Sequence, residues 1–456
     1  MSLYDVVIRN GNVVLPTGVV KTDIGVKDGK VAEIEKNLHH QGEQEWNAEH
    51  QYIFPGMIDV HVHFSEPGRE HWEGFYTGSM MMAAGGCTTY FDMPLNGIPS
   101  TVNKDALDEK ARIGNEKSVV DFGLWGGLVP GNEEDLKPLA ESGVIGFKAF
   151  LSTTGNKEFE AVDDMTLLDG MKQIARLGKV LALHSESASM TNWLKKEKEN
   201  EGKYSADDYL ETRPITAEVE AVERAIYYAE LTNCPLHFVH ISSAKAMEKI
   251  QEAKEKGMNI TVETCPHYLL FHHGHLRELG AVAKCAPPLR EDNERQKLIE
   301  LLKSDRFDMI SSDHSPCPYD LKDPNVHNLF EAWGGISGGQ FSLLASIELS
   351  LAHNIPFEKV AKWTASNPAE RFGISDRKGK IAKGADADFA FVTLDESYTV
   401  TAENYYAKHK ESLYIGHTFP CKVVGTMNRG KLVFKDGEID KQADQKWLKP
   451  QNRLYV

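Results

Sequence analysis

Short β-rich runs alternate with helical stretches over the central part of the chain. Between about residues 53 and 380 we count eight such runs, which are MIDVHVHF (57–64), TTYFDMP (88–94), DFGLWGGLV (121–129), GFKAFL (146–151), VLALHSE (180–186), PLHFVHIS (235–242), NITVETCPHYLLF (259–271) and FDMISSDHS (307–315). Amphipathic stretches such as 217–232 and 292–304 separate some of them. Strands joined by helical crossovers run parallel. Eight of them fit a closed (β/α)8 barrel better than an open doubly wound sheet.

Both ends of the chain show a different pattern. DVVIRNGNVVL and TDIGVKDGKVAEI alternate around Gly turns near the N-terminus, and KVVGTMNRGKLVFKDGEI has the same texture near the C-terminus. We expect the two ends to combine into one small β-sandwich that is discontinuous in sequence. The predicted fold is thus α/β: a TIM-like barrel over 53–380, with sandwich parts over 1–52 and over 381–456, which includes a C-terminal tail.

Composition narrows the class of protein. The 456 residues are 41% hydrophobic and 26% charged, as in ordinary globular proteins. A net charge of -16 repels phosphate backbones, so no nucleic-acid partner is expected. No signal segment opens the chain, and the apolar stretch SLLASIELSLA is interrupted by Glu348, so no membrane partner is expected. Six scattered cysteines without a C-x-x-C pair indicate a reducing, cytoplasmic location.

Ligand-type side chains fall toward the C-terminal ends of the predicted strands. They are His61, His63, Lys148, His184, His240 and Asp313. In a barrel these ends face one mouth, so the side chains are expected to converge there. Imidazoles two positions apart on a strand point to one side and can bind one cation. An isolated H-x-H can equally be a hydrogen-bonded pair in the core, and a lone strand histidine is more often structural.

Lys148 stands in an apolar setting between Phe147, Ala149 and Phe150. Desolvation favours its neutral amine. We hypothesise that this amine adds carbon dioxide and becomes a carbamate that can bridge two metal ions. The alternative is a lysine that reaches solvent or pairs with a carboxylate.

The six residues in this order resemble the amidohydrolase superfamily, specifically its binuclear cyclic-amidase branch. The resemblance covers nearly the whole chain and implies that all six bind two divalent metal ions, with Lys148 carboxylated. Zinc is the first candidate, and cobalt, manganese or iron suit the same ligands. A hydroxide held between the metals would attack a ring amide carbonyl, while Asp313 acts as general base and then acid. Asp313 acting only as a ligand is the alternative.

Within this branch, E-P-G-R-E-H-W-E-G at 66–74 resembles allantoinases. Dihydroorotases usually carry Arg where this chain has Ser65, which argues against an anionic substrate of that kind. The resemblance implies ring opening of allantoin to allantoate in purine breakdown, a homotetramer, and substrate contacts at Thr153, Ala286 and Gly335. A hydantoinase or dihydropyrimidinase is the nearest alternative, and a non-catalytic scaffold relative is another.

Overall fold

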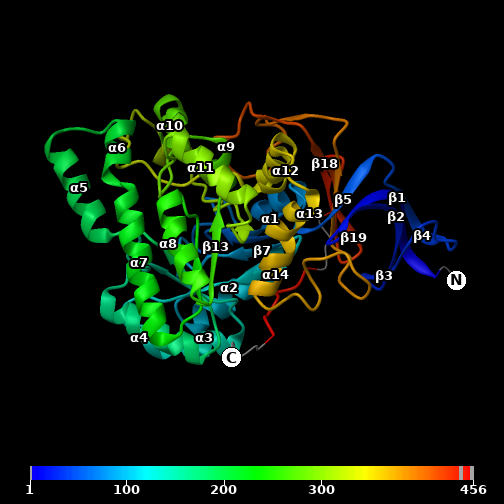
Figure 1. Ribbon diagram of the computed structural model, residues 1–456, viewed down its shortest axis with the longest axis horizontal. Helices are drawn as coiled ribbons and strands as arrows, with labels where there is room; N and C mark the ends of the chain where they lie inside the picture. Colours follow the sequence, from blue (N-terminus) through cyan, green and yellow to red (C-terminus); the bar gives the residue numbers. More distant parts are fainter. Residues whose placement is uncertain (1–2, 441–444, 452–456) are drawn as a thin grey trace.

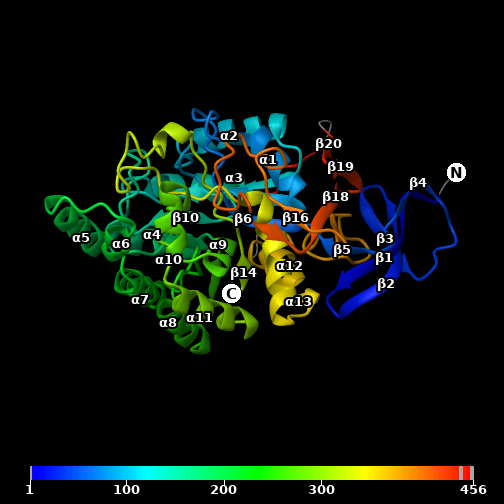
Figure 2. The same ribbon diagram turned by 90° about the horizontal axis from the view of Figure 1, so that it is seen from above.

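The computed structural model describes residues 3–440 and 445–451. Short parallel strands form the wall of a barrel in its larger part (Figures 1 and 2). They are β6 (Met57–Val62), β7 (Cys87–Asp92), β8 (Asp121–Leu124), β9 (Gly126–Gly127), β10 (Phe147–Phe150), β11 (Leu181–His184), β12 (Leu236–Phe238), β13 (Ile260–Thr264) and β14 (Met309–Ile310). The predicted barrel is confirmed.

The wall is continuous from its first strand to its last. Strands pair in the order β6-β7-β8 and β9-β10-β11-β12-β13-β14. The break between β8 and β9 lies at Trp125, whose amide donates to the carbonyl oxygen of Asp92 at 3.1 Å. The amide of His63 donates to the carbonyl oxygen of His314 at 2.8 Å, which joins the end of β6 to the segment after β14.

Helices surround this wall (Figure 1). They are α1 (Phe75–Ala84), α2 (Lys104–Lys117), α3 (Leu136–Ser142), α4 (Asp164–Arg176), α5 (Ala188–Asn200), α6 (Ala206–Thr212), α7 (Ile215–Thr232), α8 (Ala244–Glu255), α9 (Pro266–Leu270), α10 (His273–Leu279), α11 (Asp292–Lys303), α12 (Ser342–His353), α13 (Phe357–Ala361) and α14 (Asn367–Arg371). Side-chain caps fix several starts, such as Asn103, whose side chain accepts from the amide of Ala106. Within the described ranges, no helix combines the length and apolarity needed to cross a bilayer.

The run at 259–271 is only partly a strand, so the prediction of one continuous β-run is wrong in its second half. β13 ends at Thr264, and α9 begins at Pro266. Proline suits the first turn of a helix because its fixed φ is already helical and its missing N–H has no partner to lose there. The apolar residues that follow belong to this helix.

Strands from both chain ends form one nine-stranded sheet beside the barrel (Figure 1). They are β1 (Tyr4–Leu15), β2 (Gly18–Lys27), β3 (Lys30–Glu35), β4 (Gly42–Asn47), β5 (Gln51–Pro55), β15 (Phe389–Thr393), β18 (Lys422–Asn428), β19 (Lys431–Lys435) and β20 (Glu438–Ile439). A separate pair, β16 (Tyr398–Thr399) and β17 (Thr418–Phe419), lies between β15 and β18 in sequence. The predicted discontinuous β-sandwich is confirmed as a β-rich domain made from both ends, whose strands pair into this one sheet.

The two ends meet where β5 pairs antiparallel with β15, and Phe54 lies opposite Ala390. The domain boundaries at 52/53 and 380/381 stay a prediction. Residues 1–2 of the first predicted part, and residues 441–444 and 452–456 of the last, lie outside the described residues.

A buried ion cluster connects the sheet to the barrel. The ammonium of Lys378 lies 2.6 Å from a carboxylate oxygen of Asp121 in β8 and 2.5 Å from one of Asp388, which precedes β15. Asp386 is 3.2 Å away, and the Lys378 side chain is 1% exposed. Burial alone would lower the pKa of Lys378, but the three carboxylates outweigh it and raise that pKa. Arg429 also pairs with Asp121 at 3.2 Å, and Arg377 pairs with Asp386 at 2.9 Å, so Lys378 is the central cation of a larger cluster.

Substituting Lys378→Met is expected to lower the free energy of unfolding by about 3 to 5 kcal/mol, because it removes the central cation of the cluster and leaves the buried carboxylate of Asp388 without its ion-pair partner. Denaturant titration measures this. Lys362→Met is the control, since its ammonium pairs with Asp305 at 3.0 Å but is 46% exposed. The control should change by about 1 kcal/mol or less. Equal changes in both variants would contradict a stabilising role for the cluster.

Candidate active site

Ligand-type side chains from separate strands lie around one cavity at the C-terminal end of the barrel. The cavity has a volume of about 440 Å³. The predicted residues that line it are His61, His63, His184, His240 and Asp313. Lys148 is fully buried in β10. It shares a face of the wall with His184, because the two strands pair Lys148 with Ala182 and Phe150 with His184.

Two groups of donors face the centre. The first comprises the two histidines of β6 and Asp313, whose carboxylate oxygen is 3.2 Å from Nε2 of His61 and 3.3 Å from Nε2 of His63. Their ligand atoms lie within 4.8 Å of one another, a spacing that can hold a metal ion. The second is His184 and His240, with Nδ1 of the former 3.1 Å from Nε2 of the latter. The rings of His61 and His240 are 5.4 Å apart and connect the groups.

Buried carboxylates orient these imidazoles from behind. Glu263 in β13 lies 2.6 Å from Nδ1 of His61, so the Nε2 of that ring faces Asp313. Glu186 lies 2.8 Å from Nε2 of His184, which leaves Nδ1 facing His240. Such outer partners fix the tautomer and direction of a metal-binding imidazole.

The sequence did not single out these two glutamates. The only local sign of Glu186 is its position two residues beyond His184 in LALHSE, and Glu263 is a lone acid in an apolar strand. Arg213, which lines the cavity, pairs with Glu186. Burial would raise the pKa of Glu186, but Arg213 and His184 outweigh it and lower that pKa to about 2.

The charge states of the buried groups suit cation binding. Burial lowers the pKa of His63 to about 4 and holds that of His240 well below its usual range, so both rings are neutral and can donate a lone pair. For Asp313, burial would raise the pKa, but His61 and His63 outweigh it and hold that pKa well below its usual range. The carboxylate is therefore ionised.

Lys148 differs from Lys378, the buried lysine described above, because it has no ion-pair or hydrogen-bond partner among the described residues. Its Nζ lies 4.9 Å from the centre of the Phe150 ring. Burial lowers its pKa to about 7, despite the opposing charges of Asp313 and Glu263. Nδ1 of His240 also has no partner among the described residues. Unpaired buried polar atoms next to a set of N and O donors fit a metal centre.

The three predicted substrate contacts, Thr153, Ala286 and Gly335, line the same cavity. Thr153 exchanges hydrogen bonds with Asn192 of α5. Gly335 must lack a side chain, because a Cβ there would lie 2.3 Å from the carbonyl oxygen of Ser315. The roles of these residues stay predictions. Among the lining residues that sequence reasoning missed are Asn96, Asn192, Lys195, Lys284 and Trp333.

Known proteins resemble the chain over nearly its full length. Residues 52–433 match the model of the amidohydrolase family. An allantoinase of Bacillus velezensis is 54% identical, with 95% of each chain covered. An allantoinase of Deinococcus radiodurans is 43% identical over 99% of this chain and 100% of the relative. An L-hydantoinase (dihydropyrimidinase) structure from Arthrobacter aurescens, 30% identical, superposes with a TM-score of 0.95 over 98% of this chain and 100% of that one. The chain belongs to the amidohydrolase family, and within it to the group that contains these allantoinases.

Proposed function

We propose that the protein opens the ring of allantoin by hydrolysis and yields allantoate. The observation that carries this proposal is the meeting of two histidine-containing groups at a single cavity. The buried amine of Lys148 lies behind them, close enough that, in addition to burial, its charge lowers the pKa values of His63, His184 and His240. The cavity of about 440 Å³ is within the range of small-molecule sites, roughly 300 to 1,000 Å³. Relatives named allantoinase at 43% to 54% identity support this substrate over other cyclic amides.

The proposed ligands of two divalent cations are the six residues His61, His63, Lys148, His184, His240 and Asp313. The neutral amine of Lys148 would add carbon dioxide, forming an N–C bond and releasing one proton. The product would be a carbamate, whose two oxygens could act as donors to metal ions. Zinc is the proposed metal, because neutral imidazole and carboxylate-type donors suit it.

When bound, the two cations would polarise the substrate carbonyl and acidify water. Asp313 accepts the proton of the attacking water and returns it to the leaving ring nitrogen, as its ionised state allows. A C–O bond forms and the ring C–N bond breaks; the nitrogen takes the proton held by Asp313, and the new carboxylic acid loses its own proton to solvent, which leaves a carboxylate and a free ureido nitrogen. One side chain thus serves as base and then as acid.

Several groups of the cavity wall suit a substrate rich in amide groups. Side-chain amides of Asn96 and Asn192, the hydroxyl of Thr153 and the backbone at Gly335 offer both donors and acceptors. The position at which dihydroorotases usually carry Arg is Ser65 in this chain; it brings no positive charge for a substrate carboxylate, and it is buried.

We also propose a cytoplasmic homotetramer. The cysteines of the chain are free and buried, which suits a reducing compartment. Trp193 of α5 and Tyr227 and Leu231 of α7 are exposed and could contribute to subunit contacts. Sedimentation should then give four times the 50.9 kDa of one chain.

Allantoin should be hydrolysed faster than hydantoin or dihydrouracil by one zinc-loaded preparation, because the ureido group adds hydrogen bonds at the cavity wall. The measurement is kcat/KM for each substrate. A clear preference for dihydrouracil would instead assign the protein to the dihydropyrimidinases. No turnover of any of the three by metal-loaded protein would favour a scaffold relative.

Lys148→Ala should lower both the metal content and kcat. The loss in kcat should be at least about 100-fold, because substitution of a residue that only orients a metal ligand typically costs up to about that much. Stripping the unchanged protein with a chelator and restoring zinc with bicarbonate should abolish and recover activity. Lys179→Ala is a matched control. Lys179 is also buried, and burial lowers its pKa to about 8, but it lies before the start of β11, at the end of the strand away from the cavity. Full metal content and activity in Lys148→Ala would refute the bridging role.

Asp313→Asn should lower kcat by about 100-fold to 10,000-fold, since an amide of the same shape accepts no proton. Measuring metal content separates the two roles considered for this residue. Loss of activity with both metals retained supports a base, whereas a matching loss of metal and activity indicates a ligand only.

A further inference from the structure

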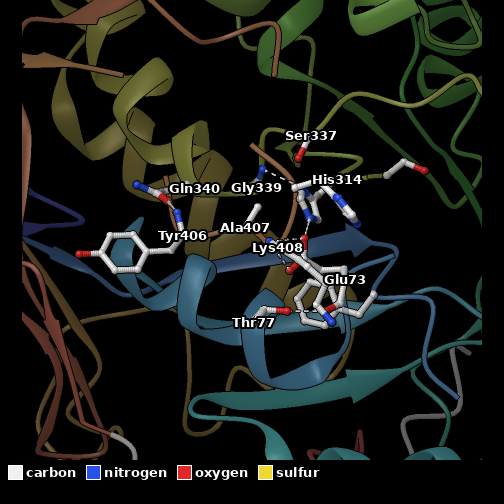
Figure 3. A network of polar contacts seen from close by, with 12 residues as sticks. Glu73, Thr77, His314, Ser337, Gly339, Gln340, Tyr406, Ala407 and Lys408 are labelled. Atoms are coloured by element: carbon white, nitrogen blue, oxygen red, sulfur yellow. Dashed lines mark hydrogen bonds and ion pairs between the residues drawn. The ribbon is translucent and has the colours of Figure 1, made fainter. Parts of the chain in front are cut away.

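A buried polar network surrounds the residue that follows Asp313 in the chain (Figure 3). At its centre are His314, the next residue in the chain, and Glu73, which precedes α1. Both side chains are fully buried. Neither lines the cavity as the structure describes it. The mechanism above does not use either of them, although each belongs to a distinctive sequence motif, SSDHS or EPGREHWEG.

Hydrogen bonds fix the His314 ring in one tautomer. Its Nδ1 lies 3.2 Å from the amide nitrogen of Gly338 and 3.3 Å from that of Gly339. Backbone amides only donate, so Nδ1 accepts and the ring proton is on Nε2. That Nε2 donates to a carboxylate oxygen of Glu73 at 3.2 Å. The ring therefore has one protonation pattern and one orientation.

Glu73 is anchored on its far side. Its carboxylate accepts from the amide of Lys408 at 3.1 Å, and its carbonyl oxygen accepts from the hydroxyl of Thr77 in α1. A hydrogen bond fixes the segment that contains Lys408: the amide of Tyr406 donates to the side-chain oxygen of Gln340 at 2.9 Å. The network thus joins α1, the C-terminal segment and the turn before α12 (Figure 3).

Two features of the cavity are close to this ring along the chain. Asp313 has a φ of 46°, in the left-handed region that residues with a side chain rarely adopt, so its surroundings must hold it there. Gly335 lines the cavity only three residues before Gly338, and the amide of Ser315 donates to the carbonyl oxygen of Ile336 at 3.0 Å. The same imidazole lies between the proton-transferring residue and the loop that contributes the cavity wall.

We propose that Glu73 and His314 are positioning residues: Nε2 of His314, held by Glu73, keeps the carboxylate of Asp313 aimed at His61 and His63, and Nδ1 holds the Gly335–Gly339 loop in register. The inference rests on the proposed function in that it takes Asp313 as the residue that moves the proton. The inference adds that the two nitrogens of the His314 ring have different roles.

Two substitutions at one position separate the two contacts. In His314→Asn the side-chain oxygen can replace Nδ1 and accept from the glycine amides, but nothing reaches Glu73. In His314→Gln the amide group can replace Nε2 and donate to Glu73, but the glycine amides lose their acceptor. Glu73→Gln removes the charge of the carboxylate while it keeps the shape.

His314→Asn and Glu73→Gln should lower kcat by about 10-fold to 100-fold with little change in KM, the loss typical of outer partners of a metal ligand. They should also release metal at about 10-fold lower chelator concentration. His314→Gln should instead raise KM about 10-fold with a smaller effect on kcat, because the loop loses its register. Melting temperatures are recorded for all variants.

Glu348→Gln is the matched control, because Glu348 also pairs with a histidine, His417, at 2.8 Å, on a half-buried part of α12. It should leave kcat, KM and metal retention within about twofold. The proposal is overturned if the two His314 variants share one kinetic defect, if both fail to fold, or if Glu73→Gln behaves like the control. Metal retention tests the pair even if the unchanged protein does not hydrolyse allantoin, in which case only the proposed function fails.

Discussion

Closure of the barrel between its first and last strands is the contact on which the site depends. One backbone hydrogen bond, from the amide of His63 to the carbonyl oxygen of His314, and the parallel bridge between Val62 and His314 join the two edges. This contact places the imidazoles of β6 against Asp313, which is remote from them in sequence. The other donors follow from the parallel order of the wall, because every strand in it ends at the same mouth.

Buried charge is handled differently at the two places where it concentrates. At the junction of the barrel with the terminal sheet, the ammonium of Lys378 is surrounded by carboxylates and is fully compensated. At the cavity, Glu263 and Glu186 compensate and orient imidazoles, but the amine of Lys148 has no hydrogen-bond partner among the described residues. The contrast marks the first cluster as structural and leaves the second ready for a ligand.

Sequence periodicity was sufficient to predict the barrel, because strands such as β6, β7 and β11 are buried along their whole length. Alternating runs around Gly turns were sufficient to predict the β-rich domain made from both ends. Periodicity also placed the ligand-type side chains at strand ends, where the structure brings them together. Sequence periodicity could not predict the carboxylates that pair with the imidazoles, because His61 and Glu263 are 202 positions apart and His314 and Glu73 are 241 positions apart. No local pattern encodes such a contact. The run at 259–271 was wrongly predicted as one strand because its apolar residues continue past the end of β13. Pro266 is the only residue in the run that indicates the change to a helix.

The pairing of β5 with β15 has a consequence for synthesis on the ribosome. β5 is translated early, but β15, with which it pairs, follows more than 300 positions later. One edge of β5 therefore stays unpaired while the whole barrel is translated. An unpaired strand edge is a template for association with other chains. In a nascent chain of this topology, the unpaired strand edge is therefore available to holdase chaperones over a long interval of translation.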